Sequence, residues 1–224
     1  MKQSDAAMKV GTDAMLLGAF VNTEGKSAGL DIGTGTGVLA LMLTQKKPEL
    51  HFDGVELDTE SAEECKLNFS NSDWSERLSV VQGDFAACKL TKSYDLIVSN
   101  PPFYQSTLLN NDARKANARH AQSLPMDILV GRVGECLSVS GDFWIIVPWE
   151  DEGRWSAACK TNGLHLNTCI TIYGKENGEA KRVVLRYSWV ENSVYRSDFT
   201  VRKENGGYTE EYRKLTMDFH EKSI

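Results

Sequence analysis

The chain has 224 residues, of which 41% are hydrophobic and 25% are charged, and its formal net charge is −6. This composition is typical of a globular protein and excludes a disordered or fibrous chain. It contains no run of about 18 apolar residues, and its first residues lack the apolar core of a secretory signal. At roughly 100–200 residues per domain, we expect a single cytoplasmic domain covering residues 1–224 and no membrane partner.

The cysteines indicate neither a disulfide framework nor a metal site. Their number is odd, neighbouring ones are at least ten residues apart, and no CxxC pair occurs. Such spacing is typical of free thiols in a reducing compartment. We therefore expect no bound metal and no disulfide among Cys65, Cys88, Cys136, Cys159 and Cys169.

In chain order, short apolar segments alternate with amphipathic ones. The first pair is a strand at residues 28–32 and a helix at residues 38–45, which two lysines and Pro48 terminate. Further strands are predicted at residues 51–57, 78–82, 94–99 and 141–148, with helices at residues 61–69 and 125–137. Because the strands are nearly all apolar, a mostly parallel sheet with helices on both faces is predicted, which is an α/β fold.

The last third of the chain has a different pattern. Two β-rich segments, residues 168–173 and 181–189, are separated by a polar turn, GKENGEA. This spacing predicts a C-terminal antiparallel hairpin. Beyond Glu191 the sequence becomes polar and then ends in an amphipathic helix candidate at residues 208–219.

A glycine-rich loop follows the first predicted strand. Asp31 precedes three alternating glycines, Gly33, Gly35 and Gly37. Glycines let the backbone turn sharply and let a ligand approach the amide groups. The GxGxG spacing fails the GxGxxG pattern of dinucleotide sites, because Val38 occupies the third glycine position. A carboxylate beside the loop would repel a pyrophosphate, but it suits a ligand that carries an ammonium group.

Two further acids end the next strands. Glu56 is placed to accept hydrogen bonds from a ribose diol. Asp84 could accept from an adenine amino group, with Phe85 packing on the ring. Acids at the ends of successive parallel strands line the carboxyl edge of the sheet, where open α/β folds bind ligands.

This combination resembles the class I S-adenosylmethionine-dependent methyltransferases over about residues 9–189. The resemblance implies a Rossmann-like, seven-stranded sheet with S-adenosyl-L-methionine as cofactor. It also implies that Asp31 and the three glycines hold the methionine end and that Glu56 holds the ribose.

Directly after the fourth strand comes Asn100-Pro101-Pro102-Phe103. NPP followed by an aromatic residue is the motif of enzymes that methylate a planar sp² nitrogen, which is a poor nucleophile. The Asn carbonyl and the backbone carbonyl of the next proline can each accept one N–H, which aims the nitrogen at the methyl group. The prolines fix the backbone, and Phe103 would stack on the flat substrate.

Such enzymes act on adenine N6, guanine N2, cytosine N4 or a glutamine amide. The segment from Met8 to Gly18 resembles that of the bacterial methyltransferases that modify adenine N6 at position 37 of a valine tRNA. The chain also resembles this family at Arg119, at Arg182 and at residues 208–215. The resemblance implies a tRNA substrate and an adenine-N6 reaction, and we expect a monomer.

Basic residues cluster just after the NPPF tetrapeptide. Arg114, Arg119 and His120 are candidates for contact with RNA, as is Arg182 by the family resemblance. Residues 1–100 carry nine basic and fifteen acidic side chains, whereas residues 101–224 carry sixteen of each. The acid excess therefore belongs to the cofactor half, and a narrow RNA contact is expected rather than a broad basic face.

Three other functions share parts of this pattern. A ribosomal-RNA guanine-N2 methyltransferase has the same NPPF motif but often carries a duplicated domain. A release-factor glutamine methyltransferase adds a helical N-terminal domain and usually has tyrosine at the position of Phe103. The third alternative is a non-catalytic cofactor-binding or RNA-binding module, which the intact motif disfavours.

Overall fold

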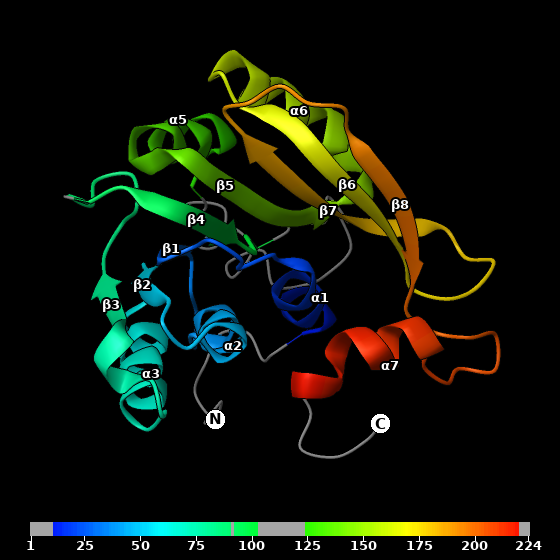
Figure 1. Cartoon of the computed structure of the whole chain (residues 1–224), viewed down its shortest axis with the longest axis horizontal. Helices are drawn as coiled ribbons and strands as arrows, with labels where there is room; N and C mark the ends of the chain where they lie inside the picture. Colours follow the sequence, from blue (N-terminus) through cyan, green and yellow to red (C-terminus); the bar gives the residue numbers. More distant parts are fainter. Residues whose placement is uncertain (1–10, 91, 103–123, 220–224) are drawn as a thin grey trace, which may run out of the picture.

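The computed structural model describes residues 11–90, 92–102 and 124–219. In these ranges the strands form one mixed sheet in the order β3-β2-β1-β4-β5-β7-β6-β8 (Figure 1). Their bounds are β1 Ala28–Ile32, β2 His51–Glu56, β3 Leu78–Gln82, β4 Tyr94–Ser99, β5 Leu137–Pro148, β6 His165–Tyr173, β7 Ala180–Ser188 and β8 Tyr195–Thr200. The strands from β3 through β5 are parallel, and β7 runs antiparallel to both β5 and β6.

The predicted α/β fold, mostly parallel sheet and antiparallel hairpin are confirmed, but the described chain has one strand more than the seven predicted. The additional strand, β8, lies in the polar segment after Glu191, where no strand was predicted. It pairs with β6 in parallel and forms one edge of the sheet. As an edge strand it has one neighbour and many exposed residues, so its sequence lacks the apolar run of the central strands.

Helices cover both faces of this sheet (Figure 1). Those of the described chain are α1 Thr12–Phe20, α2 Val38–Lys46, α3 Thr59–Ser70, α5 Met126–Cys136, α6 Glu152–Thr161 and α7 Glu210–Thr216, with short 3-10 turns η1 Ser75–Arg77, η2 Trp149–Asp151 and η3 Met217–Phe219. One core packs α1, α2, α3 and α7 on the sheet, and the other packs α5 and α6. Successive strand residues alternate between them: Trp144 belongs to the first core and Ile145 to the second.

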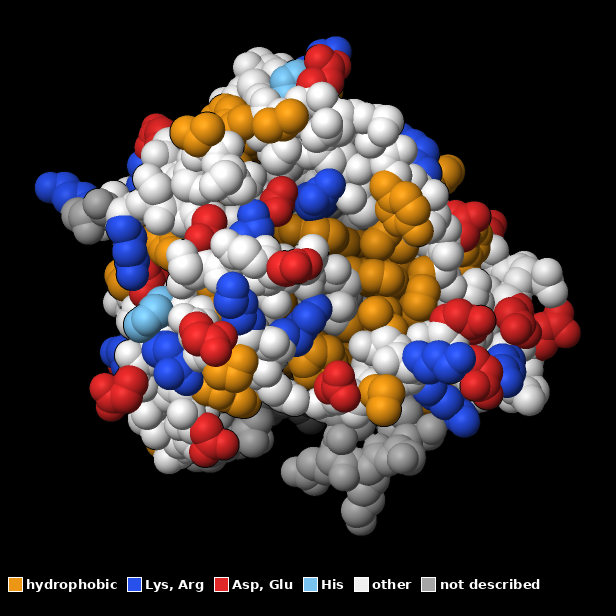
Figure 2. Space-filling view, viewed as in Figure 1, with side chains coloured by type: hydrophobic (Ala, Val, Ile, Leu, Met, Phe, Trp, Pro, Cys, Tyr) orange, Lys and Arg blue, Asp and Glu red, His pale blue; other side chains and the backbone are white. Residues whose placement is uncertain are grey.

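Charged and apolar side chains occupy different parts of the visible surface (Figure 2). In the described residues no helix is long and apolar enough to cross a membrane. Figure 2 shows acidic and basic side chains interspersed over the visible face, with apolar side chains gathered where α1, β8 and α7 meet. Phe20 of α1 and Phe199 of β8 contact each other there, edge to face, with ring centroids 5.0 Å apart.

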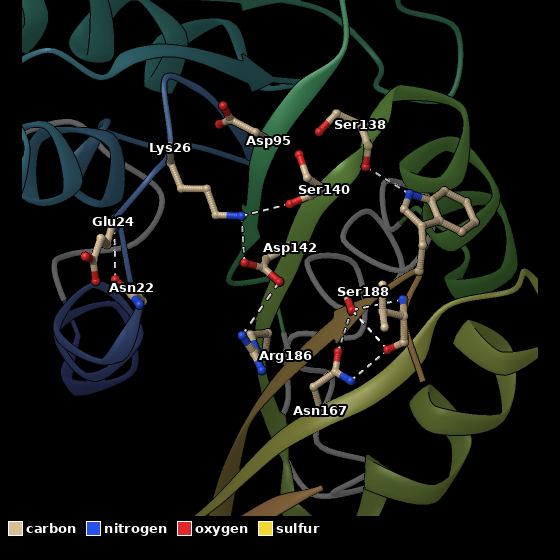
Figure 3. Close-up of polar contacts among 12 residues, drawn as sticks. Asn22, Glu24, Lys26, Asp95, Ser138, Ser140, Asp142, Asn167, Arg186 and Ser188 are labelled. Atoms are coloured by element: carbon tan, nitrogen blue, oxygen red, sulfur yellow. Dashed lines mark hydrogen bonds and ion pairs between the residues drawn. The ribbon is translucent and has the colours of Figure 1, made fainter. Parts of the chain in front are cut away.

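Polar contacts also hold the strands at the end opposite the candidate site (Figure 3). Lys26, just before β1, forms a 2.7 Å ion pair with Asp142 of β5 and donates to the backbone of Ser140. Asp95 of β4 accepts from the backbone N–H groups of Ser27 and Ala28. These contacts fix the amino ends of β1, β4 and β5 relative to one another, and thereby also fix the register at the carboxyl ends.

Candidate active site at the carboxyl edge of the sheet

The parallel register brings the predicted site residues to one edge of the sheet. Ile32 of β1 pairs with Ser99 of β4, so the glycine loop and Asn100 begin at neighbouring points. The Ser99 hydroxyl donates to the carbonyl of Ile32 at 2.9 Å and ties the two strand ends together. Glu56 ends β2 on the other side of β1. The structure therefore brings together the β1 loop, Glu56 and Asn100, as the sequence predicted.

The three loop glycines have positive φ angles but different surroundings. Gly33 and Gly35 have φ values of 70° and 56°, and a Cβ on either would meet no atom within 4 Å. A Cβ on Gly37, where φ is 84°, would lie 2.4 Å from the Phe69 ring and 2.8 Å from the Cys65 sulfur. Gly33 and Gly35 thus leave space for a ligand, whereas Gly37 lets the loop pack against α3.

Asp31 is fully buried beneath the loop. Its Oδ2 accepts a 2.7 Å hydrogen bond from the Thr34 hydroxyl, and its Oδ1 has no partner among the described residues. Burial is the main reason that the pKa of Asp31 rises to about 7, and the nearby Glu56 carboxylate adds to the rise. The side chain orders the loop through Thr34 and leaves one acceptor oxygen unused.

The raised pKa predicts that the free energy of unfolding depends on pH through Asp31. In the folded chain the pKa is about 7 against an ordinary value of 3.8, so the folded state holds the proton more tightly. The resulting stabilisation is present below about pH 4 and is lost as the pH rises through about 7, with a magnitude on the order of a few kcal/mol.

Urea unfolding between pH 5 and pH 8 measures this effect. The Asp31→Asn variant cannot ionise, so wild type should lose stability relative to it as the pH rises. Parallel pH dependences of the two proteins would contradict the prediction.

Glu56 connects the end of β2 to the glycine loop. Its Oε2 accepts from the Gly35 N–H at 2.7 Å, and its Oε1 accepts from the Asp58 N–H at 2.9 Å. Each carboxylate oxygen has a second lone pair. The group can therefore hold the loop and still accept from the hydroxyl groups of a ligand.

Asp84 lies after β3 and is exposed, and its Oδ1 accepts from the Ala86 N–H at 2.9 Å. Phe85 is 5% exposed and belongs to the core that contains α5 and α6. Arg132 of α5 lies over its ring and donates to its carbonyl. Phe85 was expected to pack on an adenine ring, but the structure places its ring in the core beneath Arg132.

Asn100 follows the last residue of β4, and its side-chain oxygen is buried. No described residue donates to this Oδ1. A buried amide oxygen without a donor is unfavourable by roughly 1–3 kcal/mol, so such an atom is expected to meet a partner when a ligand binds. Phe103 lies outside the described residues.

A cavity of about 910 Å³ is lined in part by Pro101 and Pro102. It is bounded by the start of α5, the end of β5 with η2, the start of α6, and the facing ends of β6 and β7. Trp149 lines it and is 51% exposed. Its place one residue after an apolar strand, at the carboxyl edge, is the signal that could have identified it.

Of the residues predicted to contact RNA, the structure describes Arg182 alone. Arg182 lies in β7 at the cavity wall and forms a 2.9 Å ion pair with Asp13 of α1. This pair joins α1 to the strand that lines the cavity. Arg114, Arg119 and His120 lie outside the described residues. Among the described residues no cluster of His, Cys, Asp and Glu could hold a metal ion.

Comparison with known proteins places this geometry in a family. Residues 4–147 match the methyltransferase small domain family. A tRNA1(Val) (adenine(37)-N6)-methyltransferase of Flavobacteriaceae bacterium (strain 3519-10) is 34% identical over 99% of this chain and 95% of the relative. The enzyme of the same name from Bacteroides thetaiotaomicron is also 34% identical, over 96% of this chain and 91% of the relative.

Solved structures support the fold. A predicted O-methyltransferase from Agrobacterium tumefaciens has a TM-score of 0.69 at 15% identity, over 92% of this chain and 95% of the other. The glycopeptide N-methyltransferase MtfA, solved with S-adenosyl-L-homocysteine, has a TM-score of 0.58 at 12% identity, over 81% of this chain and 90% of the other. With the sequence matches over nearly the whole length, the chain belongs to the methyltransferase small domain family and, within it, to the tRNA1(Val) (adenine(37)-N6)-methyltransferases.

Proposed function

We propose that this protein transfers a methyl group from S-adenosyl-L-methionine to N6 of adenine 37 in a valine tRNA, acting in the cytoplasm as a monomeric single domain. The observation that carries this proposal is the buried Oδ1 of Asn100 at the carboxyl end of β4, which has no hydrogen-bond donor among the described residues. It is followed by two prolines that border a cavity large enough for a nucleotide. The family membership supplies the tRNA and the position of the adenine.

The exocyclic amine of adenine is planar because its lone pair is conjugated with the ring. The Asn100 Oδ1 would accept one N–H of this amine, and the backbone carbonyl of Pro101 would accept the other. Two fixed acceptors orient the nitrogen and stabilise the positive charge that develops on it as the new bond forms. The Pro101 and Pro102 rings restrict the backbone and hold the second acceptor in place.

The residues of the edge fit S-adenosyl-L-methionine. Bound there, this cofactor supplies the sulfonium methyl group that is transferred. Gly33 and Gly35 give it open access to the loop backbone, and the Oδ1 of Asp31 under that loop has no close hydrogen-bond donor among the described residues. We assign the ribose diol to Glu56 and the adenine amino group to the exposed Asp84. Gly37 serves the same site by packing the loop on α3.

The substrate adenine lies in an anticodon loop, where it is partly unpaired. Turning it out of the loop is unfavourable by only a few kcal/mol, so a compact enzyme can bind it by loop shape and one extruded base. We propose that Phe103 stacks on this base and that Arg114, Arg119, His120 and Arg182 contact the RNA around it.

Methyl transfer to total tRNA tests the proposal. The protein is incubated with labelled S-adenosyl-L-methionine and tRNA that lacks its native modification, and the nucleosides are then separated. N6-methyladenosine from a valine tRNA is the expected product. Labelled N2-methylguanosine, or label found only in protein, would rule the proposal out in favour of the guanine or glutamine reaction.

A further inference from the structure

We propose that Trp149 stacks on an unpaired base next to the acceptor adenine, an assignment that rests on the proposed function. Trp149 begins η2, directly after the last residue of β5, and is 51% exposed. In contrast, Trp144 and Trp155 are 5% and 6% exposed and belong to the two cores. A large aromatic face left in solvent forgoes the stabilisation that burial would give, and it is available to bind a flat group.

The position of Trp149 relative to the acceptor site favours a neighbouring base. The described lining of the cavity includes Pro101 and Pro102 together with Trp149, and it does not include Asn100. The acceptor adenine, held by Asn100 and by the carbonyl of Pro101, would occupy only the part of the cavity beside the prolines. The cavity volume of about 910 Å³ is near the upper end of the roughly 300–1,000 Å³ typical for drug-sized ligands. A single purine is smaller than such ligands, so the cavity has room for a second base.

The charges around the cavity favour a base over a phosphate group. Each basic side chain in its described lining has a carboxylate partner, at 3.0 Å, 3.2 Å and 2.9 Å. These pairs are Arg154–Asp151, Lys181–Glu179 and Arg182–Asp13. A phosphate would compete with these carboxylates for the basic side chains, and Glu150 would repel it. An aromatic face binds an uncharged planar group without such competition.

The backbone holds Trp149 in a fixed place before RNA binds. The preceding residue, Pro148, pairs with Arg182 of the antiparallel strand β7, and η2 continues directly into α6. Trp155 of α6 is buried in the core and anchors that helix. A stacking face on such a rigid turn loses little conformational entropy on binding.

Binding of an unmodified anticodon stem-loop RNA tests this role. The Kd of Trp149→Ala should rise roughly 5- to 150-fold, whereas Trp149→Phe should retain most of the affinity. Tyr195→Ala is the matched control, because Tyr195 is a 63% exposed aromatic residue on β8 outside the described lining of the cavity. Its Kd should equal that of wild type, and all three variants should bind S-adenosyl-L-homocysteine normally.

Abasic RNAs identify the partner of Trp149. An abasic nucleotide on one side of the acceptor adenine should weaken binding to wild type but not to Trp149→Ala, which is the coupling expected for two groups in contact. Two results would overturn the stacking assignment: an abasic neighbour on either side weakens RNA binding equally in wild type and in Trp149→Ala, or Trp149→Ala binds the RNA with wild-type affinity. If the wild-type protein still methylates tRNA, these results leave the proposed function intact. Absence of tRNA methylation by wild type would overturn the proposed function and this inference together.

Discussion

Replacing Asn100 with alanine is expected to lower kcat by about 10²–10³-fold, by analogy with the loss of one oriented hydrogen-bonding group in other active sites. The variant loses the buried oxygen that has no partner among the described residues and that would accept an N–H of the adenine amine. Single-turnover transfer of labelled methyl groups to tRNA measures this step, and titration with S-adenosyl-L-homocysteine measures cofactor affinity. Only the rate of methyl transfer should change, because Asn100 is assigned to the acceptor adenine and not to the cofactor.

Asn22→Ala is a suitable control for this variant. Asn22 is an exposed asparagine before β1, and its side chain accepts from the Glu24 N–H at the opposite end of the sheet (Figure 3). It should retain full turnover. Near-normal turnover by Asn100→Ala would refute the catalytic assignment, and a large loss of cofactor affinity would move Asn100 to the cofactor site.

Replacing Gly37 with alanine is expected to lower the free energy of unfolding by about 2–5 kcal/mol. A left-handed backbone costs an L-residue roughly 1–2 kcal/mol, and overpacking adds roughly 1–3 kcal/mol. The new Cβ would lie 2.4 Å from the Phe69 ring, whose residue is 3% exposed and packed in the core. Urea unfolding followed by circular dichroism measures the change.

Gly35→Ala separates packing from ligand access. Its φ of 56° imposes a similar backbone strain, but a Cβ there meets no atom within 4 Å. This variant should lose only about 1–2 kcal/mol of stability, and its affinity for S-adenosyl-L-homocysteine should fall at least about tenfold, because the methyl group enters the space left for the ligand. Equal destabilisation by the two substitutions would contradict the packing role of Gly37.

The sequence predicted the central part of the fold most accurately. Strands β1, β3 and β4 have the predicted bounds. β1 and β4 are central parallel strands that are apolar on both faces, whereas β3 is an edge strand that was identified by its short apolar run. The boundary between α5 and β5 was wrong: the strand begins at Leu137, four residues before the predicted start at Gly141. The early part of β5 pairs irregularly with β4, because the register shifts between Tyr94 and Leu96 of β4. Such an irregularity has no simple periodic signal in the sequence.

Elements with few buried residues were missed. Helix α6 has two buried side chains, Trp155 and Cys159, so its apolar stripe is too narrow to stand out in the sequence.

Helix α1 was identified by resemblance to a family segment rather than as a helix. Its Asp13 forms an ion pair with Arg182, 169 residues later, and a contact over that distance depends on the folded sheet.

The candidate site could be predicted where local sequence determines geometry. Asp31, Glu56 and Asn100 each lie at or next to the end of a strand, and parallel strands place their carboxyl ends at a common edge. The different surroundings of Gly35 and Gly37 could not be predicted, because they depend on where α3 packs. Likewise, the burial of Trp144 within β5 and the exposure of Trp149 directly after that strand depend on how neighbouring elements pack.

The place of β4 in the sheet has a consequence for how this family can diversify. β4 lies between β1, which carries the glycine loop, and β5, which leads to Trp149 and the cavity. In the assignment proposed here, donor recognition therefore lies on one flank of the acceptor motif and substrate recognition on the other. Under this assignment, substitutions in β5 to β8 are expected to alter the choice of nucleic acid while the methyl-donor half stays intact.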